Sequence, residues 1–469
     1  MPSRTSQPPR VAVLADSDTR WKWGALTARR IAAADRPDRP DHPGRLGHPD
    51  RPDRLGHPDR PDRPGQPVEP AGFLLRGRAT PTARQLTEVG VGTDSVREVT
   101  GARFLRAIRE EGYDVVVLAL VGGAVQAMLH GIAALRLPRR PVLVTGYVGV
   151  VYEKLADGLL LRHGADVVLA NSRHDADRFR AVYEGVGADA SAVTEAALPF
   201  LGGSPYERRE GRDTVVFAVQ PSVPESRADR MYLLGRLAGH ARLHPSREVL
   251  LKLRSRPGEH TTHLEELPYQ RLAERLPGGL PPNLGLVYGH MGEVLDRTDL
   301  LVTVSSTAAL EALHRRVPTA ILTDLGVREA LGNHHFLGSG LLTSWDRLDA
   351  GHRPEPDGEW LARQGVAADG TYEKAFDAAR ERVAGLLRQP ELPPVAPYYT
   401  PATAPGYLPG ILARHRLAAD GGPLPGTAPA DEPTGVRRVL RETVRRAARG
   451  AYRHGVQRVA PAIRRMGEL

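Results

Sequence analysis

A cluster of three consecutive hydroxyl side chains has the residue types best suited to chemistry: Ser305, Ser306 and Thr307. Before the cluster, the apolar run 300–304 is rich in branched residues and predicts a buried parallel strand. After it, residues 308–316 are mostly good helix formers and predict a helix. The free amides and dipole of a helix N-terminus bind anions, and hydroxyl groups there add donors. Two interpretations stay open, because hydroxyls also cap helices, although no capping-box Glu or Gln follows these three.

The hydroxyl cluster belongs to an alternation of short apolar runs and helical stretches along most of the chain. This alternation predicts parallel doubly wound sheets, in which ligands bind beyond the carboxyl ends of the strands. The ends in the first half carry mainly carboxylates and glycines: Asp16, Asp18, Gly122, Gly123, Gly146, Gly149 and Glu153. Those in the second half carry groups suited to an anion: Lys252, Arg254, Tyr288, His290 and the hydroxyl cluster. Lys252 and Arg254 are expected on one side of their strand, because side chains alternate with a period of two.

The domain organisation follows from a polar, turn-rich stretch that divides the alternation into two halves. We expect two Rossmann-like domains, each with its own doubly wound parallel sheet, facing each other across a cleft. The predicted segments are 8–200 for the first domain, 201–213 for the linker, 214–392 for the second domain, 393–432 for a Pro/Gly-rich segment with a short helix, and 433–469 for a basic helical tail. Helices between 351 and 425 either close the second domain or return to the first. Residues 35–70 repeat Asp, Arg and Pro with few apolar residues, which predicts a disordered insertion.

The net charge of +9 is concentrated at the C-terminus. Residues 433–469 contain ten arginines and two glutamates, or +8, which leaves +1 for the other 432 residues. A near-neutral body argues against nucleic acid as a partner, because nucleic-acid-binding proteins spread basic residues over a folded face. The tail predicts an amphipathic basic helix that contacts anionic membrane lipid, or one that packs on the body.

Two absences in the sequence narrow the function further. The chain has no cysteine, so disulfides, thiol nucleophiles and thiolate metal sites are excluded. It also has no apolar run of about 18 residues and no apolar signal core near its start. We therefore expect a cytoplasmic protein, with peripheral attachment at the inner face of the membrane through 433–469 as an added expectation.

Four segments carry a resemblance to a known family: VAVLADSDTRWKWGALT, TGYVGVVYEKLADGLLLRHGADVVLANS, VLLKLRSRPGEHTTH and LGNHHFLGSGLL. With the SSTAALEAL motif and the two-domain layout, they resemble GT-B fold glycosyltransferases, and most closely an actinobacterial family whose substrate is undefined. The resemblance covers residues 10–200 and 213–348. It implies a nucleotide-sugar donor bound mainly by the second domain, a hydroxyl acceptor such as a cell-envelope glycan facing the first, no cofactor and no obligatory metal.

The resemblance also implies roles for individual residues. The hydroxyl cluster would hold the donor diphosphate, with Lys252 and Arg254 neutralising its charge. Glu311 would contact the donor ribose or sugar, and the alternative is a solvent-facing helix glutamate. Asn333 and His335 would belong to a donor-side loop, and the alternative there is a structural turn.

The catalytic base is expected on the first domain, since an inverting transfer needs a carboxylate or histidine near the acceptor hydroxyl. Asp16 and Asp18 follow the first strand, and alternation would place both side chains on one face. Close proximity would raise one pKa toward neutrality, whereas one of them could instead cap the next helix. Glu153 is the second candidate. Asp-Ser-Asp also matches a metal motif of the other glycosyltransferase fold, but its place after the first strand of a two-sheet chain argues against that role, and we expect no metal site.

Three other functions fit the same architecture: a nucleotide-sugar 2-epimerase, a CDP-alditol phosphotransferase, and a non-catalytic sugar- or partner-binding relative. An epimerase would convert a nucleotide sugar with no acceptor present. A phosphotransferase would require a CDP-activated donor.

Overall fold

The computed structural model of the chain describes residues 8–32, 69–77, 80–91, 96–149, 154–254, 256, 267–366 and 371–424. The predicted insertion 35–70 lies outside these residues apart from positions 69 and 70. The candidate base Glu153 and the predicted tail 433–469 also lie outside them. The expectations for these parts therefore stay predictions.

The first domain is built on a sheet whose described strands are all parallel, in the order β3-β2-β1-β4-β5-β6-β7. The strands are β1 (Val11–Ala15), β2 (Ala71–Leu75), β3 (Arg97–Val99), β4 (Val115–Ala119), β5 (Val142–Gly146), β6 (Val167–Ala170) and β7 (Val193–Glu195). The central strands are buried along their whole length, because helices cover both faces of a parallel sheet. Its helices are α1 (Asp18–Ile31), α2 (Ala83–Glu88), α3 (Gly101–Glu111), α4 (Gly122–Ala134), α5 (Leu155–Leu160) and α6 (Arg173–Gly185).

The second domain has its own parallel sheet, in the order β10-β9-β8-β11-β12-β13 among the described strands. The strands are β8 (Thr214–Ala218), β9 (Glu248–Lys252), β10 (Leu284–Val287), β11 (Leu300–Thr303), β12 (Thr319–Leu322) and β13 (Leu342–Thr343). Its helices are α7 (Arg227–Leu243), α8 (Tyr269–Ala273), α9 (Met291–Leu295), α10 (Ala308–His314), α11 (Trp345–Asp349) and the 3₁₀ turns η1 (Glu329–Leu331) and η2 (Asn333–Phe336).

Both sheets are doubly wound, which confirms the predicted fold class. In the first, the strand order reverses between β1 and β4, and in the second it reverses between β8 and β11. Ligands of open α/β sheets bind beyond the carboxyl ends of the strands at such reversals. Among the described strands, β7 and β13 are so short that they carry little periodic signal in the sequence.

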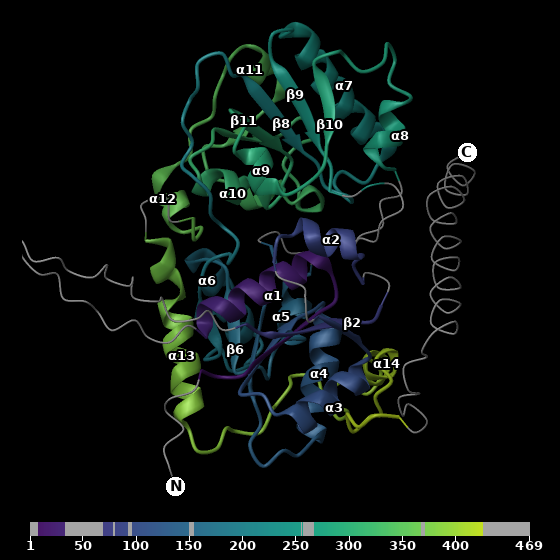
Figure 1. Ribbon diagram of the computed structural model, residues 1–469, viewed down its shortest axis with the longest axis vertical. Helices are drawn as coiled ribbons and strands as arrows, with labels where there is room; N and C mark the ends of the chain where they lie inside the picture. The colour runs from purple at the N-terminus through teal and green to yellow at the C-terminus, as the bar shows by residue number, and fades with distance from the viewer. Residues whose placement is uncertain are drawn as a thin grey trace, which may run out of the picture.

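The C-terminal helices return to the first domain. Beyond the second sheet follow α12 (Gly358–Ala362), η3 (Tyr372–Phe376), α13 (Asp377–Arg388) and α14 (Leu408–Arg414). Helices α12 and α13 descend along one side of the molecule from the second domain to the first (Figure 1). There α13 packs on α1, β5, β6 and β7, while α14 packs on α4. The predicted second domain, 214–392, is therefore wrong for α13, because this helix buries its apolar side, including Ala379 and Val383, on the first sheet.

One apolar cluster joins the two domains. It contains core residues of β1, β4 and β5 together with Leu310 and Leu313 of α10, Phe336 and Tyr372. The domains therefore share a hydrophobic seam on the side where the chain crosses between them. Apolar burial is the main favourable term in such an interface.

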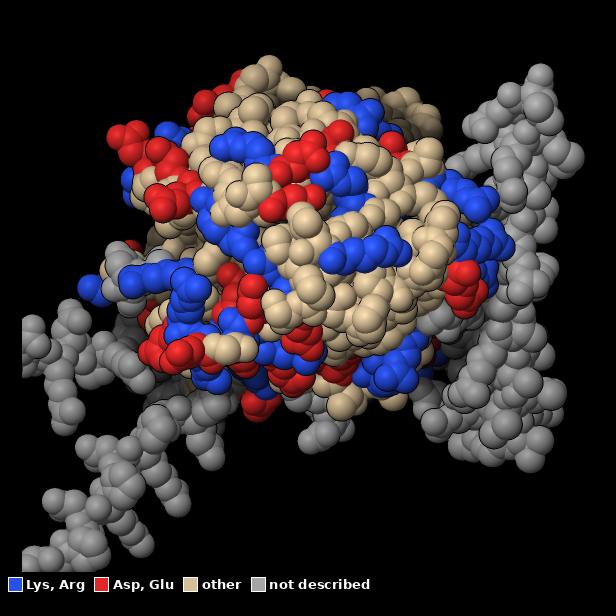
Figure 2. Space-filling view, turned by 90° about the horizontal axis from the view of Figure 1, so that it is seen from above, with Lys and Arg blue, Asp and Glu red and all other residues tan. Residues whose placement is uncertain are grey.

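The described surface and helices bear on two further expectations, nucleic-acid binding and membrane crossing. On the face over the second domain, basic and acidic side chains are interspersed, and no continuous basic patch of described residues is visible there (Figure 2). Among the described helices, none is long and apolar enough to cross a membrane.

Candidate functional site

A cleft of about 1300 Å³ lies between the two domains, and residues that follow the strands of both sheets form its walls. From the first domain come Asp18, Thr19, Lys22, Gln85, Glu88, Val148 and Lys154. From the second come residues 218–226, Lys252, Leu253, Arg254, His290, Ser305, Ser306, Thr307, Glu311 and 328–332. The cleft is therefore composite, and neither domain builds it alone.

Lys252 is the last residue of β9 and is buried in the wall of the cleft, with 8% of its surface exposed. Burial lowers the pKa of Lys252 from 10.5 to about 8, opposed in part by the nearby carboxylates of Glu88 and Glu311. Its Nζ donates to the carbonyl oxygen of Leu253 at 2.7 Å. Since no carboxylate within the described residues forms an ion pair with it, the ammonium is available to an anionic ligand.

Glu311 is the acidic counterpart on the same side of the cleft. It lies in α10 and is buried, so the alternative of a solvent-facing helix glutamate is wrong. Burial raises the pKa of Glu311, and the positive charges of Lys22, Arg315 and Lys252 oppose that rise. A buried carboxyl group beside ammonium groups is typical of binding and catalytic sites.

Lysines are concentrated in this cleft. Lysine and arginine together number 64, but only four are lysine, all within the described residues, and three of those line the cleft: Lys22, Lys154 and Lys252. Lys22 extends from α1 to place its Nζ 3.2 Å from Nε2 of His290 and 4.9 Å from the ring centre of Phe200. Sequence reasoning missed Lys22 and Lys154, although the rarity of lysine in an arginine-rich chain was a usable signal. Lysine supplies a compact charge that burial can bring close to neutral pH, whereas arginine stays protonated.

The three hydroxyl groups of Ser305, Ser306 and Thr307 differ in their hydrogen-bond partners. Ser305 donates from its Oγ to the carbonyl oxygen of Leu331 at 2.5 Å and is 2% exposed, so its hydroxyl is already used. Ser306 accepts at its Oγ from the amide of Ala308 at 3.2 Å, which is a cap-like contact. Thr307 makes no side-chain capping bond and lines the cleft. The capping interpretation therefore applies to Ser306, while Thr307 retains a hydroxyl for a ligand.

A loop on the donor side of the cleft is fixed by a buried arginine. Arg230 of α7 is 1% exposed and donates from Nε to the carbonyl of Pro224 at 2.7 Å and from Nη1 to that of Leu267 at 2.9 Å. Gln220, at the start of this loop, accepts at Oε1 from the amide of Ser305 at 3.1 Å. Sequence reasoning missed these contacts, and those of Arg230 with Leu267 and of Gln220 with Ser305 join segments distant in the chain.

The two aspartates after β1 do not form a pair. The Asp16 carboxylate binds Arg20 at 2.9 Å and accepts from the amide of Val121 at 3.1 Å, and it does not line the cleft. Asp18 does line the cleft and lies 3.3 Å from Nη2 of Arg254. The expectation of one shared face is wrong, because the strand ends at Ala15 and α1 begins at Asp18, so strand alternation does not extend across them.

Asn333 and His335 have structural surroundings, as the alternative interpretation expected. Asn333 donates from Nδ2 to the carbonyls of Leu322 and Gly326, at 3.1 and 2.9 Å, and so holds the loop after β12 together. The His335 ring is buried against Phe336 and Trp360, and burial lowers the pKa of His335 to about 3. Neither residue lines the cleft, so the structure does not bring them to the donor side.

Of the six residues that were predicted only to line the cleft, one does so and five do not. His290 lines it, whereas Gly122, Gly123, Gly146, Gly149 and Tyr288 do not. Gly122 is enclosed by Leu161 and Gly146 by Trp23, so these two positions serve packing. Gly149 faces the second domain, where a Cβ would lie 3.1 Å from Oγ1 of Thr307. Strand ends identify the correct edge of a sheet but not which of their side chains face the cavity.

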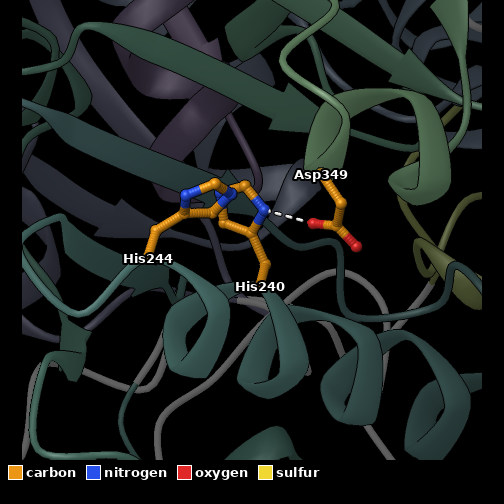
Figure 3. A group of neighbouring side chains, drawn as sticks. All are labelled: His240, His244 and Asp349. Atoms are coloured by element: carbon orange, nitrogen blue, oxygen red, sulfur yellow. Dashed lines mark hydrogen bonds and ion pairs between the residues drawn. The ribbon is translucent and has the colours of Figure 1, made fainter.

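A second cluster, at the far end of α7, has the residue types of a metal site. Within the described residues, His240, His244 and Asp349 place one ligand atom each within 4.8 Å of one another (Figure 3). However, Nδ1 of His240 is bonded to Asp349 at 2.5 Å and its Nε2 lies 2.9 Å from Nη1 of Arg247. Since both ring nitrogens of His240 are used and a guanidinium occupies the Nε2 side, we interpret the cluster as a structural link between α7 and α11.

Two doubly wound parallel-sheet domains with a composite cleft between them form the GT-B arrangement that the sequence predicted. The chain belongs to the family described as "Putative glycosyltransferase (DUF6716)", whose model matches residues 64–386. The closer actinobacterial relationship stays a prediction.

Solved structures with a related overall shape have low identity. S. aureus MnaA, solved with UDP, has 10% identity and a TM-score of 0.49 over 82% of this chain and 99% of its own. The UDP-GlcNAc 2-epimerase from Neisseria meningitidis bound to UDP-GlcNAc has 8% identity and a TM-score of 0.47 over 81% and 100%. The glycosyltransferase SnogD from Streptomyces nogalater has 16% identity and a TM-score of 0.40 over 80% and 95%. No curated protein matches the chain.

Proposed function

We propose that this protein transfers a sugar from a nucleotide-sugar donor to a hydroxyl group of an acceptor such as a cell-envelope glycan. The observation that carries the proposal is Lys252, a lysine buried in the wall of a composite cleft with a pKa lowered to about 8. Burying an ammonium without a carboxylate partner is unfavourable for folding. An anionic ligand that binds the Lys252 ammonium would explain why the protein buries this charge.

The donor diphosphate is proposed to bind against Lys252 and Arg254 of β9 and its following loop, with the Thr307 hydroxyl as a further donor. Fixed positive groups stabilise the negative charge that develops on a leaving diphosphate, and their effect is stronger in a partly buried site. Glu311 in its ionised form accepts hydrogen bonds from ribose or sugar hydroxyls. Protein cations fill the role that a divalent metal has in other transferases, so the proposed reaction is independent of metal.

The acceptor is proposed to enter from the first-domain wall, which carries Asp18, Glu88 and Lys154. A volume of about 1300 Å³ exceeds what one drug-sized ligand needs, so donor and acceptor fit together. Of the two aspartates predicted as the base, Asp18 is the one proposed, because it lines the cleft and Asp16 does not.

Thermal-shift measurements with UDP, GDP, CDP, dTDP and their sugars test the donor site. One of these nucleotides, at a hundred times its dissociation constant, is expected to stabilise the protein by about 2.7 kcal/mol. The same shift is expected with EDTA present. If no nucleotide shifts the melting temperature, the proposed function is wrong, and a shift abolished by EDTA and restored by manganese would contradict metal independence.

Incubation with the donor that binds separates the rival reactions. Conversion of the nucleotide sugar in the absence of any acceptor would identify an epimerase. Transfer from CDP-alditols alone would identify a phosphotransferase. Binding without turnover of any donor, over a range of hydroxyl acceptors, would favour a non-catalytic relative.

The basic segment 433–469 is proposed to contact anionic membrane lipid. Each basic residue near an anionic surface contributes about 1 kcal/mol, and this attraction weakens with salt. Removing 433–469 is expected to abolish cosedimentation with phosphatidylglycerol vesicles and to leave nucleotide binding unchanged. Cosedimentation that survives the deletion would exclude the segment as the anchor.

A further inference from the structure

One cation of the proposed donor site, Arg254, is bound across the cleft by side chains of the first domain. Nη2 of Arg254 lies 3.3 Å from Oδ1 of Asp18 and 2.5 Å from Oγ1 of Thr19. Arg254 comes from the second domain, whereas Asp18 and Thr19 open α1 of the first. The Asp18 carboxylate is mostly buried in this arrangement, with 16% of its side chain exposed.

The two N–H groups of Arg254 Nη2 are used by Asp18 and Thr19, so a diphosphate that binds this nitrogen must displace them. A doubly charged diphosphate attracts a guanidinium more strongly than a single carboxylate does, and it can accept from two guanidinium nitrogens, whereas Asp18 accepts from Nη2 alone. Lys252 lies on the same wall and adds to the field that draws the anion in. An anion entering beside Lys252 therefore competes with Asp18 for Arg254.

We propose that Arg254 is a gate for Asp18: its guanidinium pairs with the Asp18 carboxylate until the donor binds, and it then transfers to the donor diphosphate. This inference rests on the proposed donor site, and it adds the order in which donor and acceptor bind. The donor binds first, and its diphosphate releases Asp18 toward the acceptor. Until the donor arrives, the Asp18 carboxylate is held in the ion pair with Arg254 and does not face the acceptor hydroxyl.

The chemistry that follows is balanced within the two substrates and Asp18. The acceptor oxygen forms a bond to the anomeric carbon as its proton passes to the Asp18 carboxylate. The bond between that carbon and the diphosphate oxygen breaks, and the nucleoside diphosphate leaves with the electron pair. Arg254, now on the diphosphate, stabilises the leaving group, so one side chain acts as a mask before binding and as a positioning charge after it.

Calorimetry with inorganic pyrophosphate on the full-length protein tests the gate without knowledge of the nucleotide. Removing the competitor is expected to tighten binding, so Asp18→Asn should lower the pyrophosphate Kd about two- to fivefold, as expected for a partly exposed ion pair. Thr19→Val leaves the charge unchanged and should also tighten binding. A damaged fold would weaken binding, so a gain in affinity is not a by-product of misfolding.

Two matched variants distinguish the specific effect of the Arg254–Asp18 pair from the general effect of removing a negative charge from the cleft. Asp229→Asn removes another carboxylate of the cleft that has no contact with Arg254 among the described residues, and it should change the Kd less than Asp18→Asn does. In an Arg254→Gln background, Asp18→Asn should give no gain, because the two side chains act as one unit.

The outcomes distinguish this inference from the proposed function. If the unaltered protein binds pyrophosphate but Asp18→Asn gives no gain, or the same gain as Asp229→Asn, the gate is wrong and the donor site stands. A gain that persists in the Arg254→Gln background also overturns the gate. If neither the unaltered protein nor Asp18→Asn binds pyrophosphate, the donor site and the gate are both wrong.

Discussion

Replacing Lys252 with methionine is expected to weaken nucleoside-diphosphate binding ten- to a hundredfold and to make the ligand-free protein more stable. The loss of affinity corresponds to one charge-assisted contact in a partly buried site, about 1.5–3 kcal/mol. The side chain is 8% exposed in the cleft wall, so water cannot readily replace it. Methionine keeps the length and apolar stem of lysine and removes only the ammonium.

The gain in stability follows from the pKa of the same group. Lowering the pKa of Lys252 from 10.5 to about 8 means that its burial opposes folding by about 3 kcal/mol at neutral pH. Methionine escapes this penalty but loses the hydrogen bond to the Leu253 carbonyl, which offsets about 1 kcal/mol. A net gain of about 2 kcal/mol is expected, and opposite effects on stability and binding are the signature of a residue kept for function.

Urea denaturation and calorimetry at pH 7 measure the two effects on one variant. The matched control is Lys374→Met, because Lys374 is an exposed lysine of η3 away from the cleft. It should change neither stability nor affinity by more than about 0.5 kcal/mol. Unchanged nucleotide affinity in Lys252→Met would remove Lys252 from the site, and a destabilised variant would show that the ammonium contributes to folding.

Nucleoside-diphosphate affinity is expected to fall as the pH rises above about 8. An anion binds the protonated form of Lys252, and the fraction of that form decreases above the pKa of about 8. The affinity should therefore be level between pH 7 and 7.5 and decrease toward tenfold per pH unit above 8. The diphosphate is fully ionised throughout, since the second pKa of phosphate groups is near 6.

The stability of the ligand-free protein should change in the opposite direction. The folded-state pKa of Lys252 lies below its unfolded value of 10.5, so the burial penalty is fully present below pH 8. It disappears as the pH rises from 8 to 10.5, because lysine then becomes neutral in both states. This group alone thus adds stability on the alkaline side, while ligand binding is lost there.

Lys252→Arg is the control for the pH experiment, because arginine stays protonated across the range. Its affinity should be level up to pH 10, even where the different shape of the guanidinium lowers the absolute value. A decrease above pH 8 that remains in Lys252→Arg would assign the titration to another group.

The sequence by itself determined the two sheets and the edge at which ligands bind. Apolar runs such as 300–304, each followed by a helical stretch, leave parallel strands as the arrangement that buries both faces. That logic placed Lys252, Arg254 and Thr307 at strand ends, and all three line the cleft. Strand ends are visible in sequence because they depend on periodicity within about ten residues.

The tertiary structure alone decided which side chains meet across the cleft. Lys22 lies on a helix, and only the docking of the domains brings it to His290. The side chains of Asp16 and Asp18 separate because β1 ends at Ala15 and α1 begins at Asp18, a change of backbone direction that strand alternation does not describe. Local spacing fixes the face of an element, but the partner of that face depends on contacts between segments far apart in the chain. The edge of each sheet was therefore predictable, whereas the composite site and the pairing of Arg254 with Asp18 were not.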